Sequence, residues 1–172
     1  LYPFQFYYED LSVFDFNCIE WHWHTELEFI YIESGTVTLW IGEDQFHLTE
    51  GNGIFINTKV LHRLYSPSKA LIPNFVFMPS FITPCDSLIY QKYILPIISS
   101  SLPFLVFHKK VCWQAKVLSI MRQIISAQDS VLSKELLTSS LLQNLWLEIF
   151  ENTDISYQEA VSYTHLRAHE TE

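Results

Sequence analysis

The sequence has little positive charge. It contains 10 Lys and Arg residues against 19 Asp and Glu residues, which gives a net charge of −9, and the basic residues form no cluster. A protein that binds a phosphate backbone directly needs clustered Lys and Arg. The charge balance therefore argues against nucleic-acid binding by this chain as it stands.

Cysteine is also scarce. Cys18, Cys85 and Cys112 are scattered and form no CxxC pair, so a zinc ribbon or a thioredoxin-type site has no support. Reduced thiols in a cytoplasmic protein are the simplest interpretation. No apolar run reaches the roughly 18–20 residues that span a bilayer, and the N-terminus lacks the pattern of a secretory signal. We therefore expect a cytoplasmic protein with no membrane partner.

Both ends of the sequence are unusual. It begins with Leu1 rather than Met, so we expect a fragment at the front end. Residues 161–171 are similar, over eleven consecutive residues, to the conceptual translation of an adapter used in DNA sequencing libraries. We exclude this segment from fold reasoning and assign no function to the tail, residues 156–172; an ordinary polar tail is the alternative. Without residues 161–172 the chain keeps 9 basic and 17 acidic residues and remains acidic.

Apolar residues, in contrast, are plentiful. Hydrophobic residues make up 49% of the chain and aromatic residues 16%, which suffices for the core of one domain with an appendage. In the first half, short stretches with alternating or β-branched and aromatic residues are separated by turn residues. They predict strands at residues 4–8, within 12–24, and at 27–32, 36–41, 45–48, 54–56, 61–65 and 75–78. Many short strands at close spacing indicate a sandwich or a barrel.

The pattern becomes helical after about Pro84. Residues 87–99 are helix-like, with Pro96 expected to bend or end the helix, and residues 103–105 are expected to be a connector. Apolar residues at helical spacing predict two longer helices, at residues 111–128 and 134–150. The short link between these two helices predicts an antiparallel hairpin. Its apolar faces could pack on the barrel, on each other or on a second copy.

One stretch carries residues suited to chemistry. His22 and His24 are two residues apart, so on a strand they point to the same side, which we expect to be the barrel interior. A turn at Thr25 and Glu26 would bring Glu28 beside them on the next strand. Such a face can bind a divalent metal, or it can hydrogen-bond a sugar or a carboxylate.

The spacing of these residues resembles the cupin family. The first cupin motif is matched from His22 to Gly35, as His-x-His, three residues, Glu, six residues and Gly. The second motif is only partly kept, with Gly51 and His62 in place. The resemblance makes His62 the third imidazole of the site and implies an α+β, mainly β fold, a double-stranded β-helix barrel followed by a helical hairpin. The departures from the motifs stand at Phe16, Asn57, Lys59 and Ser66, where the family has Gly, Pro, Gly and Asn.

The wider pattern is similar to the N-terminal sensor domain of AraC-type transcription regulators. The similarity runs from about Phe14 to Asn152 and includes the stretches after His24 and around His62, residues 93–96 and the two helices. It implies a small-molecule effector, a sugar or similar polar metabolite, bound by His22, His24, Glu28 and His62 in the barrel. It also implies a homodimer through the helices and DNA binding only by a separate helix-turn-helix domain that is missing here.

We therefore expect a barrel region at residues 1–84, a helical dimerisation region at residues 85–155, no cofactor and no enzyme activity. The alternative is a stand-alone metal-dependent cupin enzyme, an oxygenase or a sugar isomerase, with the same four residues as metal ligands. The helical appendage and the eroded second motif favour the regulator. Trp21 and Trp23 alternate with the histidines and could pack under the helices, and Arg63 is expected to point away from the side of His62.

Overall fold

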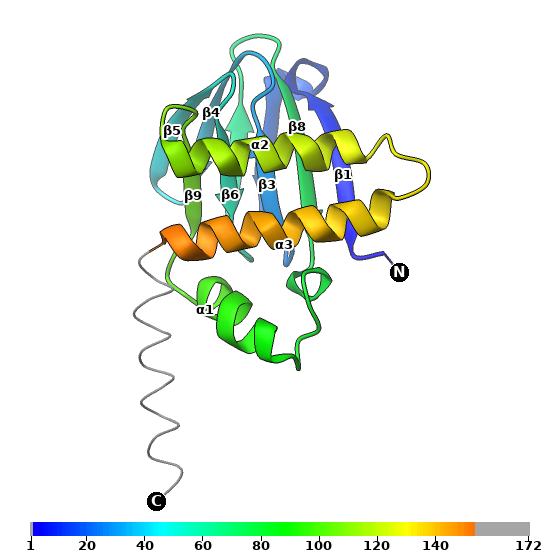
Figure 1. Cartoon of the computed structure of the whole chain (residues 1–172). Helices are drawn as coiled ribbons and strands as arrows, with labels where there is room; N and C mark the ends of the chain where they lie inside the picture. The colour runs from blue at the N-terminus through cyan, green and yellow to red at the C-terminus, as the bar shows by residue number, and fades with distance from the viewer. Residues whose placement is uncertain (1, 154–172) are drawn as a thin grey trace, which may run out of the picture.

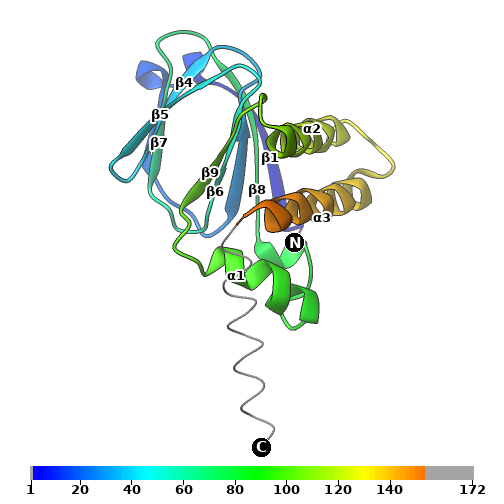
Figure 2. The same ribbon diagram turned by 60° about the vertical axis from the view of Figure 1, so that its left-hand side comes forward.

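The computed structural model describes residues 2–153; the expected tail, with its adapter-like segment, lies outside these residues. Two antiparallel sheets face each other as a barrel (Figure 2), which confirms the cupin-type fold. The five-stranded sheet has the order β1 (Phe4–Asp10), β8 (Leu71–Phe77), β3 (Leu27–Tyr31), β6 (Gly53–Ile56) and β9 (Phe104–Phe107). The four-stranded sheet has the order β2 (Cys18–His22), β7 (His62–Tyr65), β4 (Thr36–Ile41) and β5 (Asp44–Thr49).

Both faces of the central strands β3 and β6 of the five-stranded sheet are buried. On β3, Phe29 belongs to the core cluster shared with the helices, whereas the next residue, Ile30, belongs to the cluster inside the barrel. On β6, Phe55 and Ile54 divide in the same way. Strands buried on both faces read as continuous apolar runs, which explains the composition of β3. The phenylalanines of the helix-side cluster are Phe4, Phe29, Phe55, Phe75, Phe77 and Phe107.

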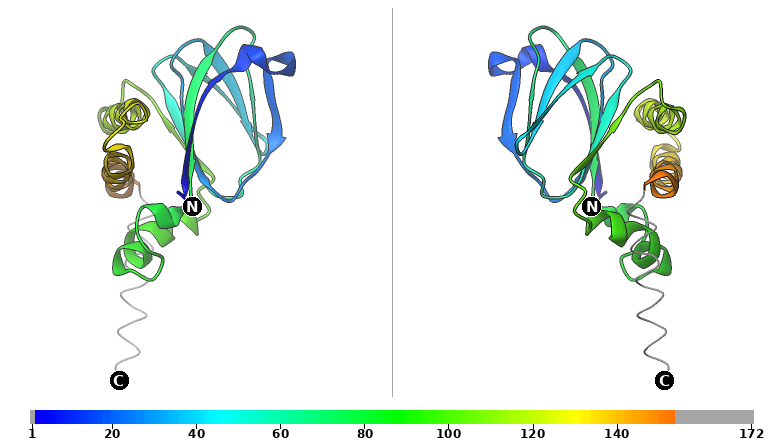
Figure 3. Two further views of the ribbon diagram at one scale, coloured as in Figure 1. Left: turned by 90° about the vertical axis from the view of Figure 1, so that its right-hand side faces the viewer. Right: turned by 90° about the vertical axis from the view of Figure 1, so that its left-hand side faces the viewer.

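The helices lie outside the barrel, on one side of it. The helices α2 (Cys112–Ala127) and α3 (Lys134–Asn152) form the predicted hairpin and cover the outer face of the five-stranded sheet (Figures 1 and 3). Trp146 packs edge-on against Phe55, with ring centroids 5.9 Å apart. Its indole N–H donates to the carbonyl of Tyr93 at 2.9 Å. The hairpin is thereby attached both to the sheet and to the segment before it.

That preceding segment is helical but irregular. Tyr90–Ile94 forms a π-helical turn, and the short helix α1 (Leu95–Ile98) follows with Pro96 in its first turn. The backbone is already helical from Leu88, so Pro96 lies within the helical run and does not end it, and the irregular π turn stands directly before it. Three short 3-10 turns occur elsewhere, at Leu11–Val13, Asp15–Asn17 and Pro79–Phe81. Within residues 2–153, no helix has the length and apolar character needed to cross a membrane.

Two expectations from the sequence are wrong. The connector predicted at residues 103–105 enters β9, which pairs with β6 and places Val106 opposite Ile54. β9 has only four residues and pairs with a segment about 50 residues earlier, so the neighbouring sequence gives little indication of a strand. Trp21 and Trp23 do not pack under the helices. They lie on and after β2, in the other sheet, and are 43% and 60% exposed.

Four positions of the cupin pattern adopt a left-handed backbone, namely Phe16, Gly35, Gly51 and Lys59. Gly35 has φ +86°, and a Cβ there would lie 2.7 Å from the carbonyl oxygen of Lys69, so this turn requires glycine. Phe16 and Lys59 stand where the family has glycine and nevertheless have φ 57° and 60°. The chain therefore keeps the left-handed turns after losing two of the glycines, at a cost of about 1–2 kcal/mol at each position.

Candidate functional site

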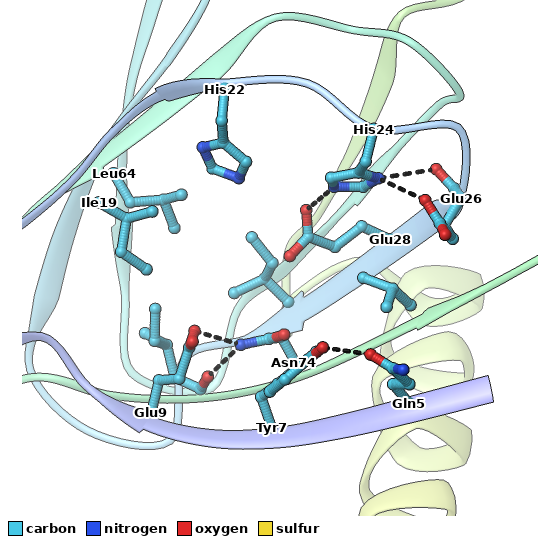
Figure 4. A pocket seen from close by; sticks show the side chains of 13 residues that line it. Gln5, Tyr7, Glu9, Ile19, His22, His24, Glu26, Glu28, Leu64 and Asn74 are labelled. Carbon is cyan, nitrogen blue, oxygen red and sulfur yellow. Dashed lines mark hydrogen bonds and ion pairs between the residues drawn. The ribbon is translucent and has the colours of Figure 1, made fainter.

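A polar cavity of about 240 Å³ lies inside the barrel, between the two sheets. Its polar lining comes from β1, β2, β3 and β8 and from the turn after β2 (Figure 4). Ile and Leu side chains close the inner end, where the barrel's aliphatic core begins. The lining residues are Gln5, Tyr7, Glu9, Ile19, His22, His24, Glu26, Glu28, Ile30, Leu64, Ile72, Asn74 and Val76.

A β-bulge determines which side chains of β2 enter this cavity. Ile19 pairs with Leu64 and His22 pairs with His62, so three steps along β2 match two along β7. The extra residue lets both Ile19 and His22 face the interior, which strict alternation would forbid. The bulge therefore aims His22, and after it His24, at the cavity, and leaves Trp21 outside.

The four predicted site residues come together. The Oε2 atom of Glu28 lies 3.1 Å from Nε2 of His24 and 3.1 Å from Nε2 of His62. The ring of His22 lies against that of His62, tilted by 57° and with centroids 4.1 Å apart. One ligand atom from each of the four residues can be chosen so that all lie within 4.8 Å of one another. Glu28 and His62 are 7% and 0% exposed, so the centre of the cluster is dry.

Main-chain carbonyls orient all three imidazoles. The Nδ1 atoms of His22, His24 and His62 lie 2.8, 3.1 and 2.9 Å from the carbonyl oxygens of Glu20, Glu26 and Val60. A carbonyl only accepts, so each Nδ1 carries the proton and each Nε2 of a neutral ring carries a lone pair. Two such lone pairs beside one carboxylate oxygen repel it. The cluster therefore favours a shared cation, either a proton or a bound positive group.

Within the described chain, the Nε2 atom of His62 is buried without a hydrogen bond. It is buried and, despite its 3.1 Å distance to Glu28, lacks the geometry of a hydrogen bond to any described residue. A buried polar nitrogen without a hydrogen bond costs about 1–3 kcal/mol. His62 does not line the cavity, so only a group that enters the cluster beside Glu28 would satisfy this atom.

The pKa values in the cluster follow from burial and charge. Burial alone would raise the pKa of Glu28, but His24 and His62 outweigh it and lower the pKa to about 2. The hydrogen bond to Glu28 raises the pKa of His24, whereas burial lowers the pKa of His22. Glu28 is therefore ionised at neutral pH, His24 is favoured to hold a proton, and His22 stays neutral.

The donor set also fits a divalent cation. Three imidazole nitrogens and one carboxylate suit Fe, Mn, Ni or Zn, and carbonyls that accept from Nδ1 are the usual supports of metal-binding histidines. Such a cation would satisfy the Nε2 atom of His62. It would supply Lewis-acid chemistry when bound, with His22, His24, Glu28 and His62 as the residues that hold it.

A second polar wall of the cavity was not predicted. Gln5, Tyr7 and Glu9 face the interior from β1, and Asn74 faces it from β8 (Figure 4). Asn74 donates to Glu9 at 2.7 Å, and Tyr7 hydrogen-bonds Gln5. Alternation along β1 could have indicated this wall. Phe4 and Phe6 pack on the helix-side core, so the residues that alternate with them face the barrel interior.

Arg63 and the two other histidines of the described residues, His47 and His108, lie outside the cavity. Arg63 forms an ion pair with Glu20 at 3.2 Å and lies 5.1 Å from the ring centroid of Trp40. It therefore points away from His62, as the alternation predicts. His47 hydrogen-bonds Thr38 on the four-stranded sheet, and neither His47 nor His108 lines the cavity.

Comparison with known proteins gives one family. A model of the AraC-like ligand binding domain matches residues 5–146. YdeC of Bacillus subtilis (strain 168), described as an uncharacterized HTH-type transcriptional regulator, is 27% identical over 107 residues. That match covers 60% of this chain and 36% of YdeC, so the chain spans little more than a third of this relative.

Solved structures agree on the fold. ToxT from Vibrio cholerae matches with a TM-score of 0.61 and 15% identity, over 90% of this chain and 57% of ToxT. A second ToxT structure, with unsaturated fatty acid bound, has a TM-score of 0.58 and 14% identity, over 90% of this chain and 56% of that one. The likeness extends over both the barrel and the helices.

Proposed function

The chain belongs to the family of AraC-like ligand-binding domains, and from this membership we propose that it is the effector-sensing and dimerisation part of a cytoplasmic transcription regulator. It binds a small polar molecule, a sugar or similar metabolite, in the barrel, and it catalyses no reaction. DNA is bound by a helix-turn-helix domain outside this chain. Support comes from the relative YdeC, which carries the name of an HTH-type regulator, and from the acidity of this chain.

The observation that carries the proposal is the polar cavity in the barrel. Ligand sites are concave, with a few polar groups aimed inward, and here His22, His24 and Glu28 come from one side and Glu9 and Asn74 from the other. A ligand in the cavity contacts β1, the N-terminal strand, which belongs to the same five-stranded sheet that supports the helices.

The ligand class of ToxT is not carried over. The fatty acid bound by ToxT bears a carboxylate on an apolar chain. The cavity here is lined by Glu9, Glu26 and Glu28 and by no Lys or Arg. Burying a carboxylate beside other carboxylates without a cation is strongly unfavourable.

Dimerisation is assigned to the helices because their outer surface exposes large aliphatic side chains. Val131 and Leu132, in the link, are 95% and 97% exposed, and Leu136 and Leu147 of α3 are 78% and 52% exposed. Clustered apolar residues of this kind mark protein interfaces. A second copy of this chain that packs on this surface would cover them.

A library of sugars and other polar metabolites, screened by thermal shift, tests the sensing role. We expect at least one compound to raise the melting temperature of the chain, and we expect His22→Ala to abolish that shift. His47→Ala, which changes a histidine outside the cavity, should keep it. Absence of any binder, or binders unaffected by His22→Ala, would refute an effector site in the barrel.

A metal-dependent cupin enzyme is the second candidate. The observation that favours it is the set of four ligand atoms within 4.8 Å. Elemental analysis of the purified chain decides: stoichiometric metal that survives dialysis and is absent from His22→Ala would favour the enzyme. A helix-turn-helix segment encoded beyond Ala160 in an intact genome would favour the regulator.

A further inference from the structure

We propose that the effector carries a protonated amino group, which binds Glu9 and the amide oxygen of Asn74. This inference rests on the proposed function, since it names the chemical class of the molecule that the barrel senses. It distinguishes cationic ligands from neutral sugars and from acids of the same size. Glu9 and Asn74 belong to the wall of the cavity opposite the histidines.

Glu9 is the carboxylate of the cavity that lacks a cationic partner. His24 and His62 face Glu28 at 3.1 Å, and Glu26 lies 3.8 Å from His24. Glu9 has only the neutral amide of Asn74, and no Lys, Arg or His of the described chain is within 4.0 Å of it. The pKa of Glu9 is raised, first by burial and also by the charge of Glu28. A cation in the cavity would relieve both effects.

Asn74, which neighbours Glu9, supplies a second acceptor on the same wall of the cavity. Its Nδ2 atom donates to the carboxylate of Glu9 at 2.7 Å and to the carbonyl of Ile72 at 3.1 Å. Both partners only accept, so the orientation of the amide is determined. Both amide hydrogens are used, and Oδ1 accepts no hydrogen bond from a described residue. Asn74 is 3% exposed, and Figure 4 shows its oxygen on the side away from Glu9, toward the cavity.

The wall therefore offers acceptors and negative charge. A carboxylate and an amide oxygen on neighbouring strands suit an ammonium group, which has three donors and no acceptor. A hydroxyl group would satisfy the amide oxygen but would leave the charge of Glu9 uncompensated. A carboxylate ligand would add a like charge.

The size of the cavity limits the ligand. A cavity of about 150 Å³ holds benzene, so about 240 Å³ accommodates roughly ten non-hydrogen atoms. Short aliphatic amines are smaller than this limit, and an aminosugar, with about twelve non-hydrogen atoms, would fill the cavity. In an aminosugar, the hydroxyl groups would reach His22 and His24 while the amino group is held at Glu9.

Two size-matched series test the charge of the ligand by calorimetry with the purified chain. One series is D-glucosamine, D-glucose and D-glucuronate; the other is 1,4-diaminobutane, 1,4-butanediol and butanedioate. We expect binding of a cationic member, with neutral and anionic members at least about tenfold weaker, because a hydrogen bond to a charged group contributes about 1.5–3 kcal/mol. Glu9→Gln keeps the acceptor for Asn74 and should weaken the cation by about ten- to a hundredfold. Glu43→Gln, in the exposed turn between β4 and β5, should leave its affinity unchanged.

The outcomes separate this inference from the sensing role. If a neutral or anionic member binds as tightly as its amine, or if Glu9→Gln has no effect on the amine, the cationic ligand is refuted and the barrel remains a sensor. If no amine of either series binds, the inference is also refuted. If the metabolite library also yields no binder, the sensing role fails with it.

Discussion

Replacing Glu28 by Gln tests whether charge holds the histidine cluster together. Gln keeps the size of the side chain and an acceptor oxygen, but it removes the negative charge that lies 3.1 Å from His24 and from His62. The pKa of Glu28 is lowered from 4.5 to about 2. One pKa unit corresponds to about 1.4 kcal/mol, so the ionised carboxylate contributes up to about 3 kcal/mol to the free energy of unfolding.

This contribution depends on pH at both ends. Since the pKa of Glu28 is lowered, its contribution is fully present above pH 4.5 and is lost as the pH falls toward about 2. Since the pKa of His24 is raised, the contribution of its imidazolium is fully present below its ordinary value of 6.5 and is lost as the pH rises through the higher folded value. Both shifts describe one interaction, so their energies are not added. We expect Glu28→Gln to destabilise the chain most between pH 4.5 and 6.5.

Urea unfolding of both proteins at about pH 5.5 and about pH 8.5, in the presence of a metal chelator, measures this dependence. The loss of unfolding free energy should be roughly 2–3 kcal/mol at the lower pH and clearly smaller at the higher pH. Glu43→Gln removes an exposed charge and should change stability by no more than about 0.5 kcal/mol at either pH. An equal loss for Glu28→Gln at both pH values would show that shape and hydrogen bonding, rather than charge, hold the cluster.

Three further predictions concern the scaffold. Gly35→Ala should lower the unfolding free energy by about 2–4 kcal/mol, because the new Cβ would meet the Lys69 carbonyl. Gly42→Ala, also at positive φ but with no atom within 4 Å of the new Cβ, should lower it by only about 1 kcal/mol. Equal losses for the two variants in chemical denaturation would contradict the close approach at Gly35. Asn57→Ala should lower the free energy of unfolding by about 2–4 kcal/mol, because Asn57 is 4% exposed and donates to the carbonyls of Ile97 and Leu102. A melting temperature unchanged from wild type would contradict this. Leu136→Asp should convert a dimer to a monomer in light scattering without loss of helical signal, and an intact dimer would place the interface elsewhere.

The sequence predicted the elements whose signals are local. The two helices after residue 110 were located by apolar spacing, and the strands of the barrel by alternation between turns. The histidine cluster was predictable because His22, His24 and Glu28 lie within seven residues and the cupin spacing supplied His62. In each case the side chains that matter are close along the chain or belong to one known motif.

The second wall escaped prediction because it is made by pairing between distant segments. Tyr7 pairs with Asn74 and Glu9 with Ile72, and no local pattern indicates that a strand near the N-terminus lies against one more than 60 residues later. Glu9 and Asn74 lie just outside the strands predicted at residues 4–8 and 75–78, whereas the structure places them within β1 and β8. Whether these two side chains meet in the cavity depends on the register of β1 and β8. The packing of Phe4 and Phe6 on the helix-side core specifies that register.

The departures from the cupin motifs prove to be structural replacements. Lys59 keeps the left-handed backbone of the glycine that it replaces, and Asn57, at the position of the family's Pro, binds two carbonyls of the segment that leads into β9. Ser66, where the family has Asn, donates to the carbonyl of Thr36 at 2.8 Å. These residues attach the barrel to its own turns and to the helical region. The second motif has therefore lost residues without losing its shape, and His62 keeps its place beside Glu28. Erosion of that motif is thus no evidence against a working site in this barrel, and the occupant has to be identified from the charges that line it.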